Sequence, residues 1–128
     1  MSRISYQDFE KMLSTDLARE NCIEIEFSLL GDEEFQYVWM GKMPDEHRKD
    51  QDMYWFGLRE DGSGAYDFPT FEEFSSAPVF HGKSLKAVWD RVEIESIDGC
   101  DPEDRLPDYL RDSGRRMGAA YGTGEGIR

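Results

Sequence analysis

The spacing of apolar residues predicts a helix near the start of the chain, followed by a hairpin of two strands. Large apolar side chains recur at helical intervals after Ser5, which can cap the helix, so we expect a helix over Tyr6–Arg19. Between Cys22 and Leu30 the period changes to two, as in a strand with one buried face. Phe35–Met40 alternates in the same way after the turn signal Gly31-Asp32, so residues 22–40 are predicted to form an antiparallel hairpin.

The elements that follow are predicted to be short. After a charged loop over Gly41–Gln51 we expect a strand over Met53–Arg59, whose large residues on both faces are typical of a central strand. Thr70 and Glu73 form a capping-box pattern, which predicts a short helix that ends before Pro78. The other predicted elements are a strand at Ala65–Phe68, an edge strand at Val79–His81, a helix capped by Ser84 with Leu85, Val88 and Trp89 on one face, a strand from Val92, and a short helical turn from Asp101.

Together these elements indicate an α+β fold with a single domain over residues 1–110. We expect a mostly antiparallel sheet of roughly four to six strands, with the N-terminal helix and one or two short helices packed on one face. Residues 111–128 contain five glycines and four arginines but few large apolar side chains, so they are predicted to form a flexible tail.

The charge of the chain changes the functional picture, because 28 acidic residues against 15 basic ones give a net charge of −13. A body of this sign is repelled by nucleic acids and by acidic membranes, so we expect no direct binding to either, and a basic partner protein instead. The start of the sequence lacks the pattern of a secretion signal and no run of 18 apolar residues occurs, which favours a cytoplasmic location. Cys22 and Cys100 are expected to be free thiols.

The histidines, the serines and the acidic clusters do not form a recognisable catalytic or metal-binding motif. His47 and His81 lack the spacing to a second ligand that a zinc site needs, and the serines near His81 lack the surroundings of a nucleophile. The acidic clusters do not match a calcium-binding loop. The sequence therefore predicts no catalytic residues, no metal site and no cofactor.

What remains is the placement of carboxylates on predicted strands. Two lie on the outer side of the first strand, two in the turn after it and two on the strand from Val92, namely Glu24, Glu26, Glu33, Glu34, Glu93 and Glu95. If these strands share a sheet, the carboxylates would line its open side at about 5–7 Å, near the spacing of backbone phosphates. The alternative is a surface that is acidic only for solubility.

Part of the sequence resembles proteins of bacterial mobile elements. Residues Thr70–Leu110, with the segments Phe71-Glu72-Glu73-Phe74, Gly82-Lys83-Ser84-Leu85, Val88-Trp89-Asp90 and Asp98-Gly99-Cys100-Asp101-Pro102-Glu103-Asp104, look like uncharacterised small acidic proteins carried on such elements. In size and charge the chain is also similar to phage-type inhibitors, such as anti-CRISPR and anti-restriction proteins. That likeness rests on composition and assigns no residues.

These observations lead to one main hypothesis and two alternatives. The main hypothesis is a non-enzymatic inhibitor or immunity-type protein whose acidic face occludes a basic, nucleic-acid-binding surface of a partner. One alternative is an enzyme or small-molecule-binding domain with an aromatic pocket around His81, lined also by Tyr37, Trp39 and Trp55. The other is an accessory domain of a larger assembly.

Overall fold

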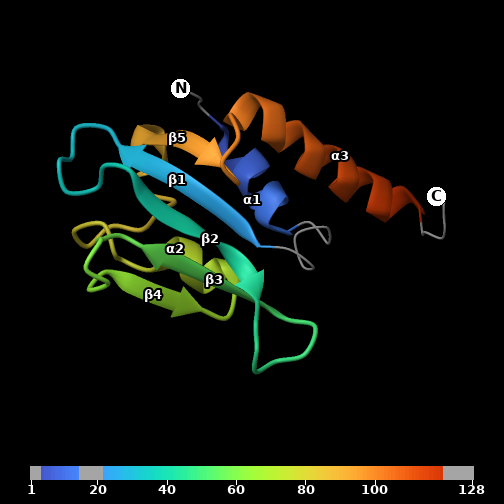
Figure 1. The fold of residues 1–128 in the computed structure, drawn as a ribbon, viewed down its shortest axis with the longest axis horizontal. Coiled ribbons are helices and arrows are strands. Elements are labelled where there is room, and N and C mark those ends of the chain that lie inside the picture. The colour runs from blue at the N-terminus through green and yellow to red at the C-terminus, as the bar shows by residue number, and fades with distance from the viewer. Residues whose placement is uncertain (1–3, 15–21, 120–128) are drawn as a thin grey trace.

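Five strands form one antiparallel sheet in the order β4-β3-β2-β1-β5 (Figure 1). The computed structural model describes residues 4–14 and 22–119, and side chains as far as residue 110. The central strand of the sheet is β2, which pairs with β1 on one side and with β3 on the other. The strands are β1 (Ile23–Leu29), β2 (Val38–Pro44), β3 (Asp52–Gly57), β4 (Ala65–Phe68) and β5 (Val92–Ile97).

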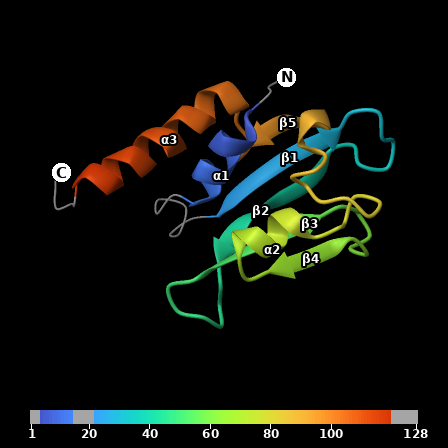
Figure 2. The same cartoon turned by 180° about the vertical axis from the view of Figure 1, so that it is seen from behind.

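The helices lie on one face of the sheet, which we call the covered face (Figure 2). α1 (Tyr6–Ser14) and α2 (Phe71–Ser76) pack on its two halves, and α3 (Pro102–Ala119) contacts α1 and β5. A short 3-10 helix, η2 (Trp89–Arg91), leads directly into β5. The α+β fold with an antiparallel sheet and an N-terminal helix is therefore confirmed.

Aromatic packing under α1 and α2 explains why these helices lie on the sheet. Phe74 of α2 is fully buried, and its ring stacks on that of Phe56 in β3 at a centroid distance of 4.3 Å. Phe9 of α1 is also fully buried and lies 4.6 Å from the ring of Trp89. Rings of this size bury much apolar area, and tilted or stacked pairs add to that gain.

The local signals for α2 are confirmed. The backbone N–H of Glu73 donates to Thr70 Oγ1 at 3.1 Å, which is the capping interaction that the sequence pattern predicts. The helix ends at Ser76, before Pro78, because a residue that precedes proline disfavours helical backbone angles. β4 has the predicted bounds.

The second hairpin strand begins later than predicted and runs further. Phe35–Met40 was expected to be extended, yet the strand starts at Val38 and continues to Pro44, through residues assigned to a loop. Tyr37 has a φ of 55°, which interrupts extended backbone, and the Gln36 side-chain amide donates to the carbonyls of Leu29 and Asp32. Residues 30–37 therefore form a folded connection between β1 and β2. Phe35 is buried in this connection, although it does not belong to a strand.

Three further expectations on the second half of the chain are wrong in detail. Val79–His81 makes only an isolated bridge between Phe80 and Lys83. Ser84 does accept from the N–H of Ala87, but the N–H groups of Trp89 and Arg91 bond to carbonyls three residues back, so turns and the 3-10 helix η2 form in place of an α-helix. The expected short turn from Asp101 is the 18-residue helix α3. The predicted end of the first helix at Arg19 lies outside the described residues, and so do residues 120–128 of the predicted tail.

Candidate protein-binding face

The face of the sheet opposite the helices carries no helix in the described part of the chain, and we call it the open face. Its side chains are those that alternate with the core positions and share rows across the strand register. One row runs Glu24, Gly41, Trp55 and Asp67, and the next runs Glu26, Trp39, Gly57 and Ala65. Each row therefore places a carboxylate and a tryptophan on the same surface.

Two glycines on the open face lie next to the indole of Trp55, and Gly41 is the one where a side chain would collide with it. A Cβ atom at Gly41 would lie 2.8 Å from Cζ2 of Trp55 and 2.0 Å from the carbonyl oxygen of Ile23. A Cβ atom at Gly57 would lie 3.7 Å from Cζ3 of the same ring. The indole thus lies against the sheet over positions without a side chain, which is a common reason for glycine inside a strand.

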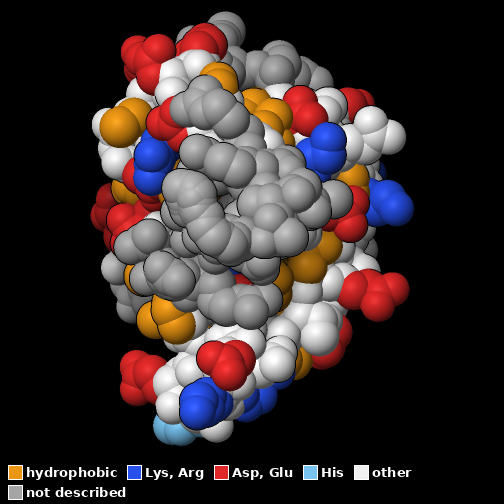
Figure 3. All heavy atoms as spheres, turned by 90° about the vertical axis from the view of Figure 1, so that its right-hand side faces the viewer, with side chains coloured by type: hydrophobic (Ala, Val, Ile, Leu, Met, Phe, Trp, Pro, Cys, Tyr) orange, Lys and Arg blue, Asp and Glu red, His pale blue; other side chains and the backbone are white. Residues whose placement is uncertain are grey.

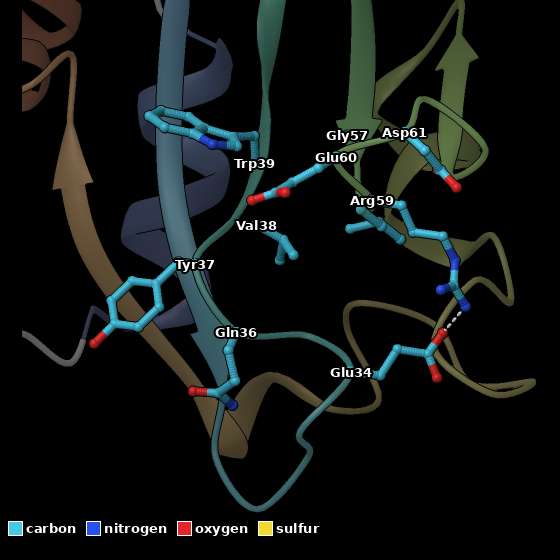
Figure 4. Close-up of a pocket in the computed structure, with 10 residues that line it drawn as sticks. Glu34, Gln36, Tyr37, Val38, Trp39, Gly57, Arg59, Glu60 and Asp61 are labelled. Atoms are coloured by element: carbon cyan, nitrogen blue, oxygen red, sulfur yellow. Dashed lines mark hydrogen bonds and ion pairs between the residues drawn. The ribbon is translucent and has the colours of Figure 1, made fainter.

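Trp39 and Tyr37 are the exposed aromatic side chains of this region. Trp39 is 39% exposed and faces Glu26 directly across the β1–β2 ladder, a pairing that brings Cβ atoms within about 4.5–5.5 Å. Tyr37 is 62% exposed, and its N–H donates to Ser28 Oγ at 3.0 Å. Figure 4 shows the Tyr37 side chain lying across β1 toward β5.

A hollow of about 630 Å³ opens beside Trp39 (Figure 4). Its lining residues come from the connection before β2, from β2 itself and from the segment that follows β3. Among them are the carboxylates of Glu34, Glu60 and Asp61 and a single basic side chain, Arg59, which forms an ion pair with Glu34. The Glu60 side chain extends across the hollow toward Trp39. The hollow therefore combines an indole with an excess of negative charge.

The structure places the six carboxylates of the sequence hypothesis in different surroundings. Glu24 is exposed and Glu26 half-buried, and both lie on the open face as expected. Glu33 and Glu34 lie in the connection between β1 and β2, where Glu34 is engaged by Arg59. Glu24 lies near the start of β1, whereas Glu33 and Glu34 lie beyond its end, so the four residues are spread along the length of this strand.

The two carboxylates of β5 do not form the exposed row that the alternation predicted. Glu93 pairs with Ser28 across the ladder but is only 6% exposed, at the end of the face over which Tyr37 lies. Glu95 is half-buried and has no partner in the β1–β5 register, because the register shifts by one residue there. A row of carboxylates at phosphate spacing is therefore absent from the described part of β5.

Negative charge by itself does not single out one face. In Figure 3, which views the molecule along its right-hand side, acidic side chains appear around the whole visible outline, with basic ones among them. What distinguishes the open face is the combination of carboxylates with exposed indole and phenol rings. In the sequence, Gly41 is a signal for the close packing of Trp55 on this face, because glycine in a strand often marks the close approach of another group.

His81 occupies a different position from the one expected for a pocket base. Its Nε2 lies 3.2 Å from Asp32 Oδ2 and 3.5 Å from Glu34 Oε1, and its ring lies 5.0 Å from that of Phe35. Of the residues predicted to line a common pocket, Tyr37 and Trp39 line the hollow, whereas Trp55 and His81 are not among its lining residues. This hollow therefore brings together two of the four side chains, without His81.

A buried ion pair on the covered face was not predicted. Lys42 is 2% exposed, its Nζ lies 3.0 Å from Asp52 Oδ2, and it also donates to the carbonyl of Leu13 at the end of α1. The second carboxylate oxygen of Asp52 is buried without a hydrogen-bond partner among the described groups. Such a pair ties α1 to the β2–β3 hairpin, and removing one partner leaves a buried charge uncompensated.

A polar cluster at the start of α3 joins this helix to the sheet. Asp98, which has a φ of 55°, accepts from the N–H of Glu24 through Oδ1 and from Arg105 Nε and the Tyr109 hydroxyl through Oδ2. Burial, followed by the bond to Asp98, raises the pKa of Tyr109 above its usual range. The hydrogen bond with Asp98 raises the pKa of Arg105. The cluster explains the position of α3 and needs no catalytic role.

Comparison of the chain with models of protein families, with curated protein sequences and with solved structures finds no match. Within the described residues, no helix has the length and apolar character needed to cross a membrane. The same part of the chain contains no group of three or more histidine, cysteine or carboxylate side chains arranged to hold a metal ion. The geometry of the open face is therefore the main guide to function.

Proposed function

We propose that the protein is a non-enzymatic inhibitor of the anti-CRISPR, anti-restriction or immunity type. Its open face docks on a basic, nucleic-acid-binding surface of a partner protein and occludes it. The observation that carries this proposal is the pair of rows on the open face, in which Glu26 lies beside the exposed Trp39 and Glu24 lies in the row of Trp55.

The chemistry of these rows fits protein recognition. Tryptophan and tyrosine are enriched among residues that dominate interface energetics, while carboxylates around them orient a basic partner and speed its association. With a net charge of −13, the long-range potential of the protein attracts cationic surfaces and repels nucleic acid. An occluding inhibitor needs both properties.

The test compares two variants that carry the same net charge. One replaces Glu24 and Glu26 on the open face by lysine, and the other replaces Glu10 and Glu72, which are exposed on the helix side. Each variant, and the wild type, is used to isolate partners from the native host, and each purified partner is then assayed for binding to a duplex oligonucleotide.

The proposal expects a partner that wild type and the Glu10/Glu72 variant retain and the Glu24/Glu26 variant loses. The wild type should displace the oligonucleotide from that partner, and it should do so less well between about 0.1 and 1 M salt, as the Debye length shortens from about 10 to 3 Å. A partner that binds all three proteins equally and still holds its nucleic acid would contradict the proposal.

A second candidate function is the binding of a small molecule in the hollow. The observation that favours it is that Tyr37 and Trp39 line a concave space together with several polar groups. A compound that raises the unfolding midpoint of wild type, but not of a Trp39→Leu variant, would support this function in place of the first.

A further inference from the structure

We infer that the hollow beside Trp39 receives an arginine side chain of the partner, with the guanidinium group stacked on the indole and held by carboxylates on either side. This inference rests on the proposed function and specifies the chemistry of its central contact.

Two carboxylates flank the exposed indole. Glu26 lies directly across the β1–β2 ladder from Trp39, on the β1 side. Glu60, which follows β3, extends toward Trp39 from the opposite side of the hollow (Figure 4). A cation that lies on the indole can therefore reach a carboxylate in either direction.

The basic group that already lines the hollow is engaged elsewhere. The Arg59 guanidinium is ion-paired with Glu34, at the edge of the hollow away from Trp39. Glu60 and Asp61 line the same space, so its charge remains negative after this pairing is taken into account. The hollow is thus complementary to one further cationic side chain.

The shape of the site favours arginine over lysine. A guanidinium is planar, stacks on an aromatic face and forks toward carboxylates through parallel N–H groups, and it is more weakly hydrated than an ammonium group. A lysine ammonium is a compact charge that would gain the Coulomb attraction without the stacking. With about 630 Å³, the hollow has room for the whole side chain and for the backbone that presents it.

The test is an NMR titration of the full chain with two blocked pentapeptides, one with two arginines and one with two lysines, separated by glycines. The indole N–H signals of the three tryptophans report on separate places. Trp39 and Trp55 lie on the open face, while Trp89 donates its Nε1–H to the carbonyl of Ile4 at 2.7 Å and serves as an internal control.

We expect the arginine peptide to bind about two- to fivefold more tightly than the lysine peptide, because the guanidinium stacks on the indole and forks toward the carboxylates, whereas the more strongly hydrated ammonium group makes a weaker contact. The Trp39 signal should shift most and the Trp89 signal should stay in place. The preference for arginine should disappear in Trp39→Leu and remain in Tyr66→Leu, because Tyr66 is equally exposed, at 40%, but belongs to the row of Phe56 on the covered face. Glu60→Gln should weaken the binding of both peptides.

The possible failures separate the two proposals. Equal affinity for the two peptides, with the Trp39 signal shifting in both titrations, would overturn the arginine inference and leave the acidic docking face standing. No shift of Trp39 or Trp55 with either peptide would overturn the inference and would also remove the support for the open face as the docking surface. A preference for arginine that survives in Trp39→Leu would place the guanidinium elsewhere.

Discussion

The two faces of the sheet use aromatic residues in opposite ways. On the covered face, Phe56 and Phe74 stack on each other and are shielded by α2, so the rings serve the stability of the fold. On the open face, Trp39 and Tyr37 remain exposed beside carboxylates, so each buries less apolar area than a core ring. The contrast suggests that the first face maintains the structure and that the second is available for a partner. Each of the following predictions tests that division.

The largest effect is expected from Phe74→Ala on the covered face. Phe74 is fully buried and packs against the rings of Phe9, Phe56 and Phe71, so truncation leaves a cavity and should lower the free energy of unfolding by about 3–5 kcal/mol. Urea denaturation followed by circular dichroism measures the change. Trp39→Ala is the control, and a comparable loss of stability in that variant would show that the open face also belongs to the core.

Lys42→Met tests the buried ion pair on the covered face. The substitution leaves the buried Asp52 carboxylate without its cation, so we expect a loss of about 3 kcal/mol in the free energy of unfolding. The double variant Lys42→Met/Asp52→Leu should regain most of it, because neither charge then remains buried. If the double variant is no more stable than the single one, the ion pair has a role in the fold that apolar packing cannot replace.

The elements that could be predicted from the sequence differ from β2, which contains Lys42 of the buried ion pair. α2 and β4 were predicted well because their signals are local, a cap three residues from its partner and a strand bounded by a glycine turn and a proline. β2 was partly missed because Gly41 and Lys42 resemble loop residues. Their places in a central strand depend on Trp55, Asp52 and the carbonyl of Leu13, which are distant in sequence.

The candidate site was predictable only in part, for the same reason. Alternation identified Glu24 and Glu26 as outward residues, since a strand turns successive side chains to opposite faces. It could not show that Glu93 would be buried, or that Glu60, from another segment, would extend toward Trp39. Those placements follow from tertiary packing.

Gly41→Ala is expected to lower the free energy of unfolding by less than Phe74→Ala does, because it adds one methyl group to a closely packed position on the open face. The new methyl group would meet the Ile23 carbonyl at 2.0 Å and the Trp55 ring at 2.8 Å, so backbone and ring must both move. We expect a loss of about 1–3 kcal/mol. Gly62→Ala in an exposed turn, where nothing lies within 4 Å but φ is +84°, measures the cost of backbone strain alone. If Gly41→Ala has no effect on stability, the indole is not packed against the sheet.

A pH titration tests how α3 is attached to the sheet. The pKa of Tyr109 is raised above its ordinary value of 10.0 in the folded protein, so its contribution to stability is complete below that pH and is lost as the pH rises above it. The free energy of unfolding should therefore fall as the pH rises above about 10, and it should fall less steeply in Tyr109→Phe. Tyr6, whose pKa is also raised by burial, remains in both proteins and accounts for part of the slope. Identical slopes would mean that the Tyr109 hydroxyl does not depend on the Asp98 cluster.

The smallest change in stability is expected for the Glu24→Lys/Glu26→Lys variant that tests function. Glu24 is exposed and Glu26 is half-buried, so the substitutions should alter the free energy of unfolding by no more than about 0.5 kcal/mol. The chain carries a net charge of −13, so removing two carboxylates weakens the repulsion among those that remain. This weaker repulsion should raise the free energy of unfolding. Glu93→Lys is the informative contrast, because the same exchange at a residue that is 6% exposed must bury an ammonium group and should cost more than about 1 kcal/mol. Chemical denaturation of the two variants side by side decides the matter. If the Glu24/Glu26 variant were as unstable as Glu93→Lys, any loss of partner binding would reflect unfolding. The carboxylates of the open face would then be needed for the stability of the fold and could not be assigned to binding alone.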